Sequence, residues 1–460
     1  MSETFPDYMS QSPSPAALHA AKSDVLLVDV ARELSDLSWE LWPSVFKGRG
    51  KLGIEGVGLV TIPAMLEVIA QTEALFESAR INCVLFGNVP TGVFNHALYL
   101  LARRRGIKTL VLKRLLFEST TDLTLLIPSI EEGAQDVRRA YREALTEEIE
   151  DAQSDTLLPE DIRAHLRRIR DSNSETDSTP TYFQEKQKFA AGGEGIFSWP
   201  REWARAALNT VYKKKSTKLE EFGGRDNLRQ RDERKKLIRA YKELSTPVVF
   251  DVPFIYVPLH IQPEASTTPN GGLFTHQHLM VDMLSKRVPD GWRIVVKEHP
   301  NQLKFYYPNQ LFRSPGYYRS LAAYRNVTLC AVDESAVALT SKARAVATVT
   351  GYSGWQAVNW GVPVLAFGHP WYEFCHGVFS IRSESDLREA LDSIASGFKP
   401  HLSHVDLFVR ILLDHAIKGH YRKADEHLGE SRPYGADLEG KLDTAFATRE
   451  ATENVHQYRR

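Results

Sequence analysis

Val-Val-Lys-Glu-His-Pro stands at residues 295–300 of this chain. Its apolar start predicts a short strand over 294–296, and Pro300 ends it, because proline cannot donate to a strand ladder. Lys297 and His299 are two residues apart, so on an extended chain their side chains point to the same side. We therefore expect both side chains at the carboxyl end of this strand.

About fifty residues later, residues 350–364 have the sequence Thr-Gly-Tyr-Ser-Gly-Trp-Gln-Ala-Val-Asn-Trp-Gly-Val-Pro-Val. This pattern predicts a turn at Gly351 and Gly354, then a helix that begins near Ser353 and ends before Gly361. The start of such a helix leaves backbone N–H groups unpaired at the positive end of the helix dipole, where an anion can satisfy them. The two stretches together indicate a site for a nucleotide diphosphate or a phosphodiester.

Strand and helix patterns alternate along much of the chain. Short apolar runs at 25–30, 83–86 and 109–112 predict strands separated by amphipathic helices, and a second succession of this kind begins at Val248. Strands that alternate with helices are typical of an α/β fold with a parallel sheet. We therefore predict an α/β fold of two doubly wound, Rossmann-like domains that face each other, with ligands bound at the carboxyl ends of their strands.

The succession is interrupted by a charged stretch of helical pattern from about 130 to 245. We predict three parts of the chain. Residues 1–245 form an N-terminal Rossmann-like domain that includes this helical insertion, residues 246–400 form the domain with the anion site, and residues 401–460 form a C-terminal helix and a polar tail.

Charge and cysteine content exclude several classes of protein. The 460 residues include 57 Lys and Arg against 58 Asp and Glu, so no overall field favours nucleic acid as a partner. Cys83, Cys330 and Cys375 offer neither a disulfide framework nor a zinc motif and suit a reducing cytoplasm. We find no signal peptide and no apolar run near the ~20 residues of a membrane helix. We therefore expect a cytoplasmic protein, whose contact with the inner membrane face, if it has one, is peripheral.

Four motifs between residues 250 and 375 follow one another along the chain. They are Pro258-Leu259-His260 followed by Gln262-Pro263-Glu264-Ala265-Ser266-Thr267, then Lys297-Glu298-His299-Pro300, then Thr350-Gly351 with Gly354-Trp355-Gln356-Ala357, and finally Gly361-Val362-Pro363-Val364 with Gly368 and Trp371-Tyr372. In order and spacing they resemble the capsule polysaccharide synthesis proteins, a family that includes bacterial Kdo transferases. A weaker match lies at residues 88–107.

The resemblance implies a two-domain fold of GT-B type and a glycosyltransferase that builds a bacterial surface polysaccharide. Its His-Pro element is similar to that of bacterial sialyltransferases, where it holds the phosphate of a cytidine nucleotide. The implied donor is a nucleotide sugar, CMP-Kdo or a related CMP-sugar, and the implied acceptor is a glycan or glycolipid on the side of the N-terminal domain. No separate cofactor is implied. Because the chain has no Asp-x-Asp motif, we expect a metal-independent enzyme without a metal site.

Glu264 is the candidate catalytic carboxylate, as a general base or as a stabiliser of oxocarbenium-like charge, and His260 beside it is the second catalytic candidate. Two alternatives stay open: Glu264 as a helix-start residue that satisfies backbone amides, and His260 as a ligand of the donor carboxylate. The residues expected to bind the donor are Gln262, Lys297, His299, Pro300, Gly351, Ser353, Gly354 and Gln356. The residues expected on the acceptor side are Asn88, Asn95 and His96.

Two positions depart from the family pattern. Gln356 stands where the family usually has Glu, a residue expected to bind the nucleotide ribose, and Asn95 stands where relatives often have Asp. If that Asp acts as nucleophile or base in relatives, this chain must supply a carboxylate from elsewhere. Two further functions stay open: a transferase that moves a polyol phosphate from a CDP-alcohol, because such proteins share the His-Pro element, and a non-catalytic nucleotide-binding scaffold of polysaccharide assembly, because Asn95 replaces the Asp.

Overall fold

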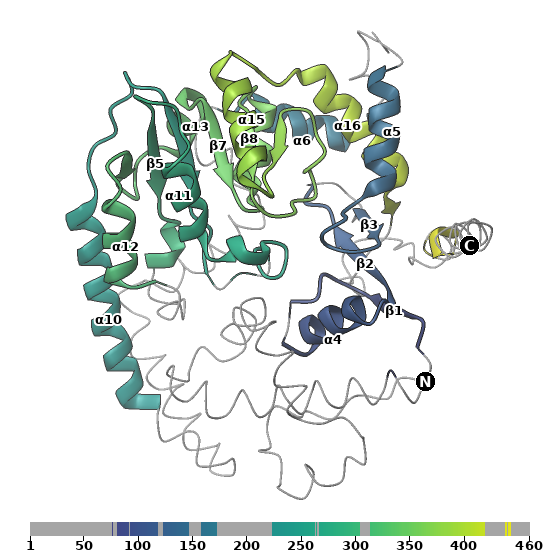
Figure 1. The fold of residues 1–460 in the computed structure, drawn as a ribbon, viewed down its shortest axis with the longest axis horizontal. Coiled ribbons are helices and arrows are strands. Elements are labelled where there is room, and N and C mark those ends of the chain that lie inside the picture. Colours follow the sequence, from purple (N-terminus) through teal and green to yellow (C-terminus); the bar gives the residue numbers. More distant parts are fainter. Residues whose placement is uncertain are drawn as a thin grey trace, which may run out of the picture.

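The computed structural model describes part of the chain. The described residues are 76, 81–91, 93–117, 123–146, 158–172, 223–262, 264, 266–303, 313–418, 438 and 440–442. Within them the chain forms two α/β units, each built around its own sheet (Figure 1). The strand predicted at 25–30 lies outside the described residues. None of the described helices is both long enough and apolar enough to cross a membrane.

The first unit has a four-stranded sheet in the order β1-β2-β3-β10. Its elements are β1 (Cys83–Phe86), α4 (Val93–Arg104), β2 (Lys108–Arg114), β3 (Leu123–Ile127), α5 (Gln135–Thr146) and, from the far end of the described chain, β10 (Ile417–Lys418). β1 and β2 pair in parallel, as the βαβ pattern predicts, whereas β3 pairs antiparallel with both β2 and β10. The short apolar run of β3 was not among the predicted strands.

The second unit has six parallel strands in the order β6-β5-β4-β7-β8-β9. They are β4 (Phe254–Pro258), β5 (Arg293–Lys297), β6 (Val327–Leu329), β7 (Ala345–Thr348), β8 (Val364–Ala366) and β9 (Val378–Ser380). Counted within this unit, the order is 3-2-1-4-5-6, which is that of the Rossmann fold. The predicted α/β class with a parallel sheet is therefore confirmed.

Helices and short 3-10 turns connect these strands. They are η3 (Gly272–Thr275), α11 (Gln277–Ser285), η4 (Pro300–Leu303), α12 (Pro315–Ala322), α13 (Ala336–Lys342), α14 (Tyr352–Asn359) and α15 (Glu384–Ala395). Three of the helices begin at serines that accept a backbone N–H of the first turn: Ser314, Ser335 and Ser383. Gly361 follows α14 with a φ of 72°, so the glycine expected to end this helix does so in the left-handed region.

The helices of the predicted insertion contact elements that lie after residue 250. They are α5, α6 (Glu160–Arg170) and α10 (Gly223–Leu244). α5 packs on α16 (Leu402–His415), α6 packs on α14, and α10 packs on α12 along the edge of the second unit (Figure 1). Arg170 of α6 forms an ion pair of 2.5 Å with Asp406 of α16. Of the described helices of this insertion, α6 and α10 therefore lie against the second unit, whereas α5 belongs to the first.

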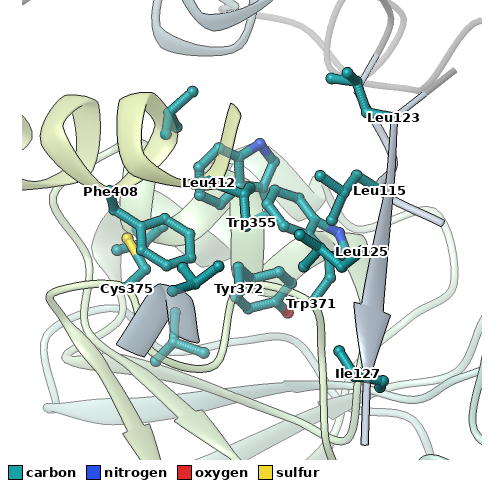
Figure 2. Packing of buried hydrophobic residues seen from close by; sticks show 14 of the residues in the cluster. Leu115, Leu123, Leu125, Ile127, Trp355, Trp371, Tyr372, Cys375, Phe408 and Leu412 are labelled. Carbon is teal, nitrogen blue, oxygen red and sulfur yellow. The ribbon is translucent and has the colours of Figure 1, made fainter. Parts of the chain in front are cut away.

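An apolar cluster joins the two units. In Figure 2, the side chains of Leu125 and Ile127 point from β3 toward Trp355, Trp371 and Tyr372 of the second unit. All five residues belong to one buried cluster. The rings of Trp355 and Trp371 are 4.7 Å apart between centroids. Trp355 is fully buried, so it belongs to the core and has no surface for stacking a sugar.

A polar contact lies beside this apolar cluster. The Lys113 ammonium at the end of β2 donates to the His369 carbonyl at 2.7 Å. Nearby, Glu373 accepts from Arg382 at 2.9 Å, and its carboxylate lies against the backbone of Gly133. Burial lowers the pKa of Lys113, with Glu373 as the strongest opposing influence. The two units therefore meet through ionic as well as apolar groups.

Gly133 offers a test of this contact. A Cβ at Gly133 would lie 2.2 Å from a Glu373 carboxylate oxygen, and Gly133 has a φ of 67°. Gly106 has nearly the same φ, 68°, but a Cβ there would meet nothing within 4 Å. Alanine at either position costs about 1–2 kcal/mol in left-handed strain. We expect Gly133→Ala to lower the free energy of unfolding by roughly 2 kcal/mol more than Gly106→Ala, because overpacking adds to the strain.

Urea unfolding of the two variants, followed by tryptophan fluorescence, measures this difference. Equal losses of stability would mean that Gly133 and Glu373 are not in contact in solution.

Candidate functional site

The strand order of the second sheet reverses between β4 and β7, and ligands of such sheets bind in the crevice at this reversal, beyond the carboxyl ends of the strands. His260 and Glu264 follow β4, and Thr348 to Gly351 end and follow β7. His299 follows β5, the strand next to β4. The topology therefore gathers the main sequence-predicted residues at one edge of the sheet, which we call the switch-point site.

His260 links the chain segments that follow β4 and β7. Its Nε2 lies 3.0 Å from Oγ1 of Thr348 and accepts the backbone N–H of Thr350 at 3.3 Å. A backbone N–H can only donate, so Nε2 carries no proton and the ring proton is on Nδ1. Nδ1 faces a carboxylate oxygen of Glu264 at 3.4 Å. Nδ1 of His260 is therefore the nitrogen that donates to Glu264 and orients its carboxylate.

Glu264 lies between two histidines, with 29% of its side chain exposed. Burial alone would raise the pKa of its carboxyl group. Hydrogen bonds from His260 and Ser266, together with the electrostatic influence of His260 and His299, outweigh burial and hold that pKa below its ordinary value. Glu264 is therefore ionised at neutral pH and can accept a proton or stabilise positive charge.

His299 has the opposite tautomer from His260. Its Nδ1 accepts the backbone N–H of Asn301 at 3.1 Å, which leaves the proton of the neutral ring on Nε2. The side chain is half-buried and close enough to Glu264 to lower the pKa of that carboxyl group. Pro300, which begins η4, is exposed beside it. Nε2 of His299 is therefore the ring nitrogen that can donate an N–H, the kind of group that binds an anion.

The start of α14 forms another wall of this site. Gly351 caps the helix, its N–H donates to Thr348 Oγ1 at 3.1 Å, and its carbonyl accepts the Gly354 N–H at 3.0 Å. The amides of Tyr352 and Ser353, in the first turn, have no acceptor within the helix. Ser353 is half-buried, and its amide lies at the positive end of the helix dipole.

The two glycines of this turn are required by packing. A Cβ at Gly351 would lie 3.0 Å from Cε1 of His260, and one at Gly354 would lie 2.3 Å from the Tyr372 hydroxyl oxygen. That hydroxyl donates to the Gly351 carbonyl. Gly351 thus lets the His260 ring lie against the helix start, whereas Gly354 lies in the core below it. Of the two glycines, Gly351 is therefore the one beside the switch-point site.

Lys297 does not accompany His299 in the way that the sequence predicted. Its ammonium donates to the carbonyl of Glu334, in the loop after β6. Because β6 and β4 flank β5 on opposite sides, this contact turns the Lys297 side chain away from β4. The alternation of side chains along a strand fixes only the direction in which the Lys297 side chain leaves the backbone. Where its ammonium group ends is decided by the hydrogen bond to Glu334.

Gln262 and Gln356 differ in their surroundings. Gln262 is fully buried, where its backbone N–H donates to Gln302 and its side-chain amide donates to Thr267, both at 2.7 Å. It therefore holds the loop after β4 in shape. Gln356 is half-buried and lies one helical turn after Ser353, so both side chains belong to the same face of α14.

The three residues predicted on the acceptor side belong to the first unit. Asn88, in the exposed loop after β1, accepts the Val89 N–H at 2.8 Å, and Asn95 is exposed on α4. His96 is only 2% exposed, and burial lowers its pKa to about 4, so it is a neutral core residue. The burial of His96 does not suit contact with an acceptor, whereas the exposure of Asn88 and Asn95 does.

Sequence inspection missed several residues that hold the site together. Arg313 forms a buried ion pair with Glu298 at 2.7 Å, and Gln277 accepts the His260 N–H at 2.7 Å. Thr348 joins His260 to Gly351. The sequence showed Glu298 only as a member of the Lys-Glu-His-Pro motif, without a role of its own. No motif near Arg313 indicates that it belongs to the site. Among the described residues, no group of three or more His, Cys, Asp or Glu is arranged to hold a metal ion.

Comparison with known proteins gives one family and several distant structures. Residues 253–389 match the family of capsule polysaccharide biosynthesis proteins. No curated protein matches the chain. The KpsC β-Kdo 2,7 transferase of Thermosulfurimonas dismutans is 19% identical over 40% of this chain and 55% of its own length, with a TM-score of 0.23. The β-Kdo 2,4 transferase of the same KpsC is 15% identical over 39% of this chain and 63% of its own length, with a TM-score of 0.22.

A third solved structure covers more of the chain. UDP-GlcNAc 2-epimerase from Neisseria meningitidis, bound to UDP-GlcNAc, is 14% identical over 76% of this chain and 80% of its own length, with a TM-score of 0.26. The matched segment 253–389 contains the whole second sheet and the switch-point site. The resemblance inferred from the four sequence motifs is therefore confirmed for this segment, which is similar to the capsule polysaccharide biosynthesis proteins.

Proposed function

We propose that the protein is a glycosyltransferase of bacterial surface polysaccharide biosynthesis that uses a nucleotide-activated sugar, CMP-Kdo or a related CMP-sugar. The observation that supports it most is the meeting of three groups at the switch-point site: the ionised Glu264, the N–H donor of His299, and the start of α14. An anion-binding wall beside a carboxylate suits a reaction in which a phosphate leaves an anomeric carbon.

In this mechanism, the phosphate of the donor lies against the first turn of α14 and accepts a hydrogen bond from His299 Nε2. Both interactions strengthen as negative charge builds on the leaving phosphate, so they lower the barrier. Glu264 acts as general base towards the acceptor hydroxyl or stabilises oxocarbenium-like charge. His260 holds the Glu264 carboxylate in place through its Nδ1–H. The acceptor approaches from the side of the first unit, where Asn88 and Asn95 are exposed.

Isothermal titration with CMP, CDP, UDP and GDP tests the donor. We expect selective binding of the cytidine nucleotides and a loss of about 10- to 100-fold in affinity in His299→Ala, since a hydrogen bond to a charged group contributes about 1.5–3 kcal/mol. His401→Ala, which removes an exposed histidine of the same unit, is the matched control and should bind as the wild type does.

Each other result of the titration excludes part of the proposal. Preference for UDP or GDP would overturn the cytidine donor, and unchanged affinity in His299→Ala would overturn the phosphate site. Turnover assays with CDP-alcohols then separate the classes of enzyme, because a product that retains the phosphorus would identify a polyol phosphotransferase.

A further inference from the structure

We infer that Arg313 is a positioning residue of the switch-point site, which fixes His260 and His299 relative to each other and thereby sets the place of Glu264 between them. The inference rests on the proposed function, because it assigns Arg313 a part in donor binding at that site. Arg313 lies just before α12, some distance along the chain from every motif of the site.

The Arg313 guanidinium contacts the segments after β4 and β5 at once. Its Nε donates to Glu298 Oε2 at 2.7 Å, and its Nη2 donates to the backbone carbonyl of His260 at 3.0 Å. Its Cζ lies 4.5 Å from the centre of the Tyr317 ring, so the plane of the group is held by stacking as well. A rigid, forked donor is suited to join two acceptors at a fixed separation.

Glu298 passes this constraint on to His299. Its Oε1 accepts the backbone N–H of His299 at 2.7 Å, while its Oε2 accepts from Arg313 and from the Tyr318 hydroxyl at 2.8 Å. Its own backbone N–H donates to the Tyr241 hydroxyl at 2.9 Å. The chain of contacts therefore runs from the His260 carbonyl through Arg313 and Glu298 to the His299 amide.

The Arg313–Glu298 pair is almost completely removed from water, with 3% of one side chain and none of the other exposed. Burial of two charges costs free energy that their attraction barely returns, so such a pair is weak evidence for stability. The pair instead fixes positions, because Arg313 binds the main-chain carbonyl of His260 and Glu298 binds the main-chain N–H of His299. A brace of this kind keeps Glu264 next to the two histidines before any ligand binds.

The test replaces Arg313 by lysine, which keeps the charge but loses the forked geometry. Arg170→Lys is the matched control, since Arg170 also pairs with a mostly buried carboxylate, that of Asp406, and donates to Asn359 at the end of α14 that lies opposite to the helix start at the site. We expect Arg313→Lys to lose roughly 10-fold in CMP affinity, because it weakens the contact of His299 with the phosphate without removing it, and Arg170→Lys to stay within twofold of the wild type. Glu298→Gln is the milder second variant should Arg313→Lys fail to fold.

The second readout is the nitrogen NMR spectrum of histidine-labelled protein, which reports ring tautomers without any ligand. In the wild type we expect His260 protonated on Nδ1 and His299 on Nε2. In Arg313→Lys or Glu298→Gln at least one of these signals should change, and in Arg170→Lys neither should. A purely structural role would lower the stability of all three variants without moving the two signals.

The outcomes separate this inference from the proposed function. If the wild type binds CMP, and Arg313→Lys or, should it not fold, Glu298→Gln binds equally well with unchanged histidine signals, the inference is wrong and the donor site stands. If the wild type binds no nucleotide, the proposed function fails, and the histidine signals alone decide whether Arg313 positions the two rings.

Discussion

Replacement of Glu264 by glutamine is expected to lower the turnover of the sugar donor by about a thousandfold, while CMP affinity stays within a few-fold of the wild type. The carboxylate lies 3.4 Å from His260 and is held ionised by its surroundings, so it is ready to accept a proton or to face positive charge. Glutamine has nearly the same shape and can still accept from His260. Only the charge and the basicity are removed, and these matter in the transition state.

Release of CMP from the donor, measured at saturating and at limiting donor concentration, separates turnover from binding. His260→Gln serves as the companion variant, because it removes the group that orients Glu264 and should have a smaller effect on turnover. Full turnover in Glu264→Gln would show that the catalytic assignment is wrong and that Glu264 only satisfies backbone amides at its turn.

The carboxylate of Glu264 should also make the stability of the protein depend on pH in the acid range. The pKa of Glu264 in the folded protein lies below the ordinary value of 4.5, so ionised Glu264 contributes stability above that ordinary value. This contribution is lost as the pH falls through the folded pKa. The stability difference between wild type and Glu264→Gln should therefore be present at neutral pH and shrink in acid, as the pH falls below that ordinary value.

Trp355→Ala is expected to cause the largest loss of stability, about 4 kcal/mol, because it opens a cavity in a core that both units share. Trp355 is fully buried against Trp371 and Tyr372, and β3 lies across from it (Figure 2). Chemical unfolding followed by far-ultraviolet circular dichroism measures the loss. We expect both units to be affected together, since residues of β3 belong to the same cluster.

Trp355→Phe is the control for this prediction. The indole N–H of Trp355 is buried without an acceptor, so phenylalanine removes an unsatisfied donor along with part of the ring. Its cost should be well below that of alanine. A loss below about 1 kcal/mol in Trp355→Ala would mean that the two units do not share this core in solution.

The sequence predicted elements that are decided by local pattern. The strand before Lys297, the helix after Gly351 and the glycine that ends it depend on residues within a few positions, and the structure has them as β5, α14 and Gly361. β3 was not predicted, although Asp122 before it and Pro128 after it are residues that typically border a strand. Its partners, β2 and β10, are chosen by tertiary pairing and not by neighbours in sequence.

The site was predicted in part for the same reason. His260, Glu264 and His299 follow strand ends, and parallel topology gathers strand ends at one edge. The directions of side chains are set by distant partners: Lys297 turns to Glu334 and His96 turns into the core of the first unit. Arg313 could not be predicted at all, because its role exists only through contacts with two other segments.

The chain returns to its first sheet after the second unit, and this limits where the protein can be cut into separate domains. After α16 the polypeptide adds β10 to β3, so the first unit is assembled from two separate pieces of sequence. A protein cut at residue 400 would lose β10, the edge strand of the first sheet, and α16, which packs on α5 and on α14. A chimera that exchanges the second unit between relatives would therefore have to include residues 401–418. Without them, both units would lack elements that they have in the intact protein.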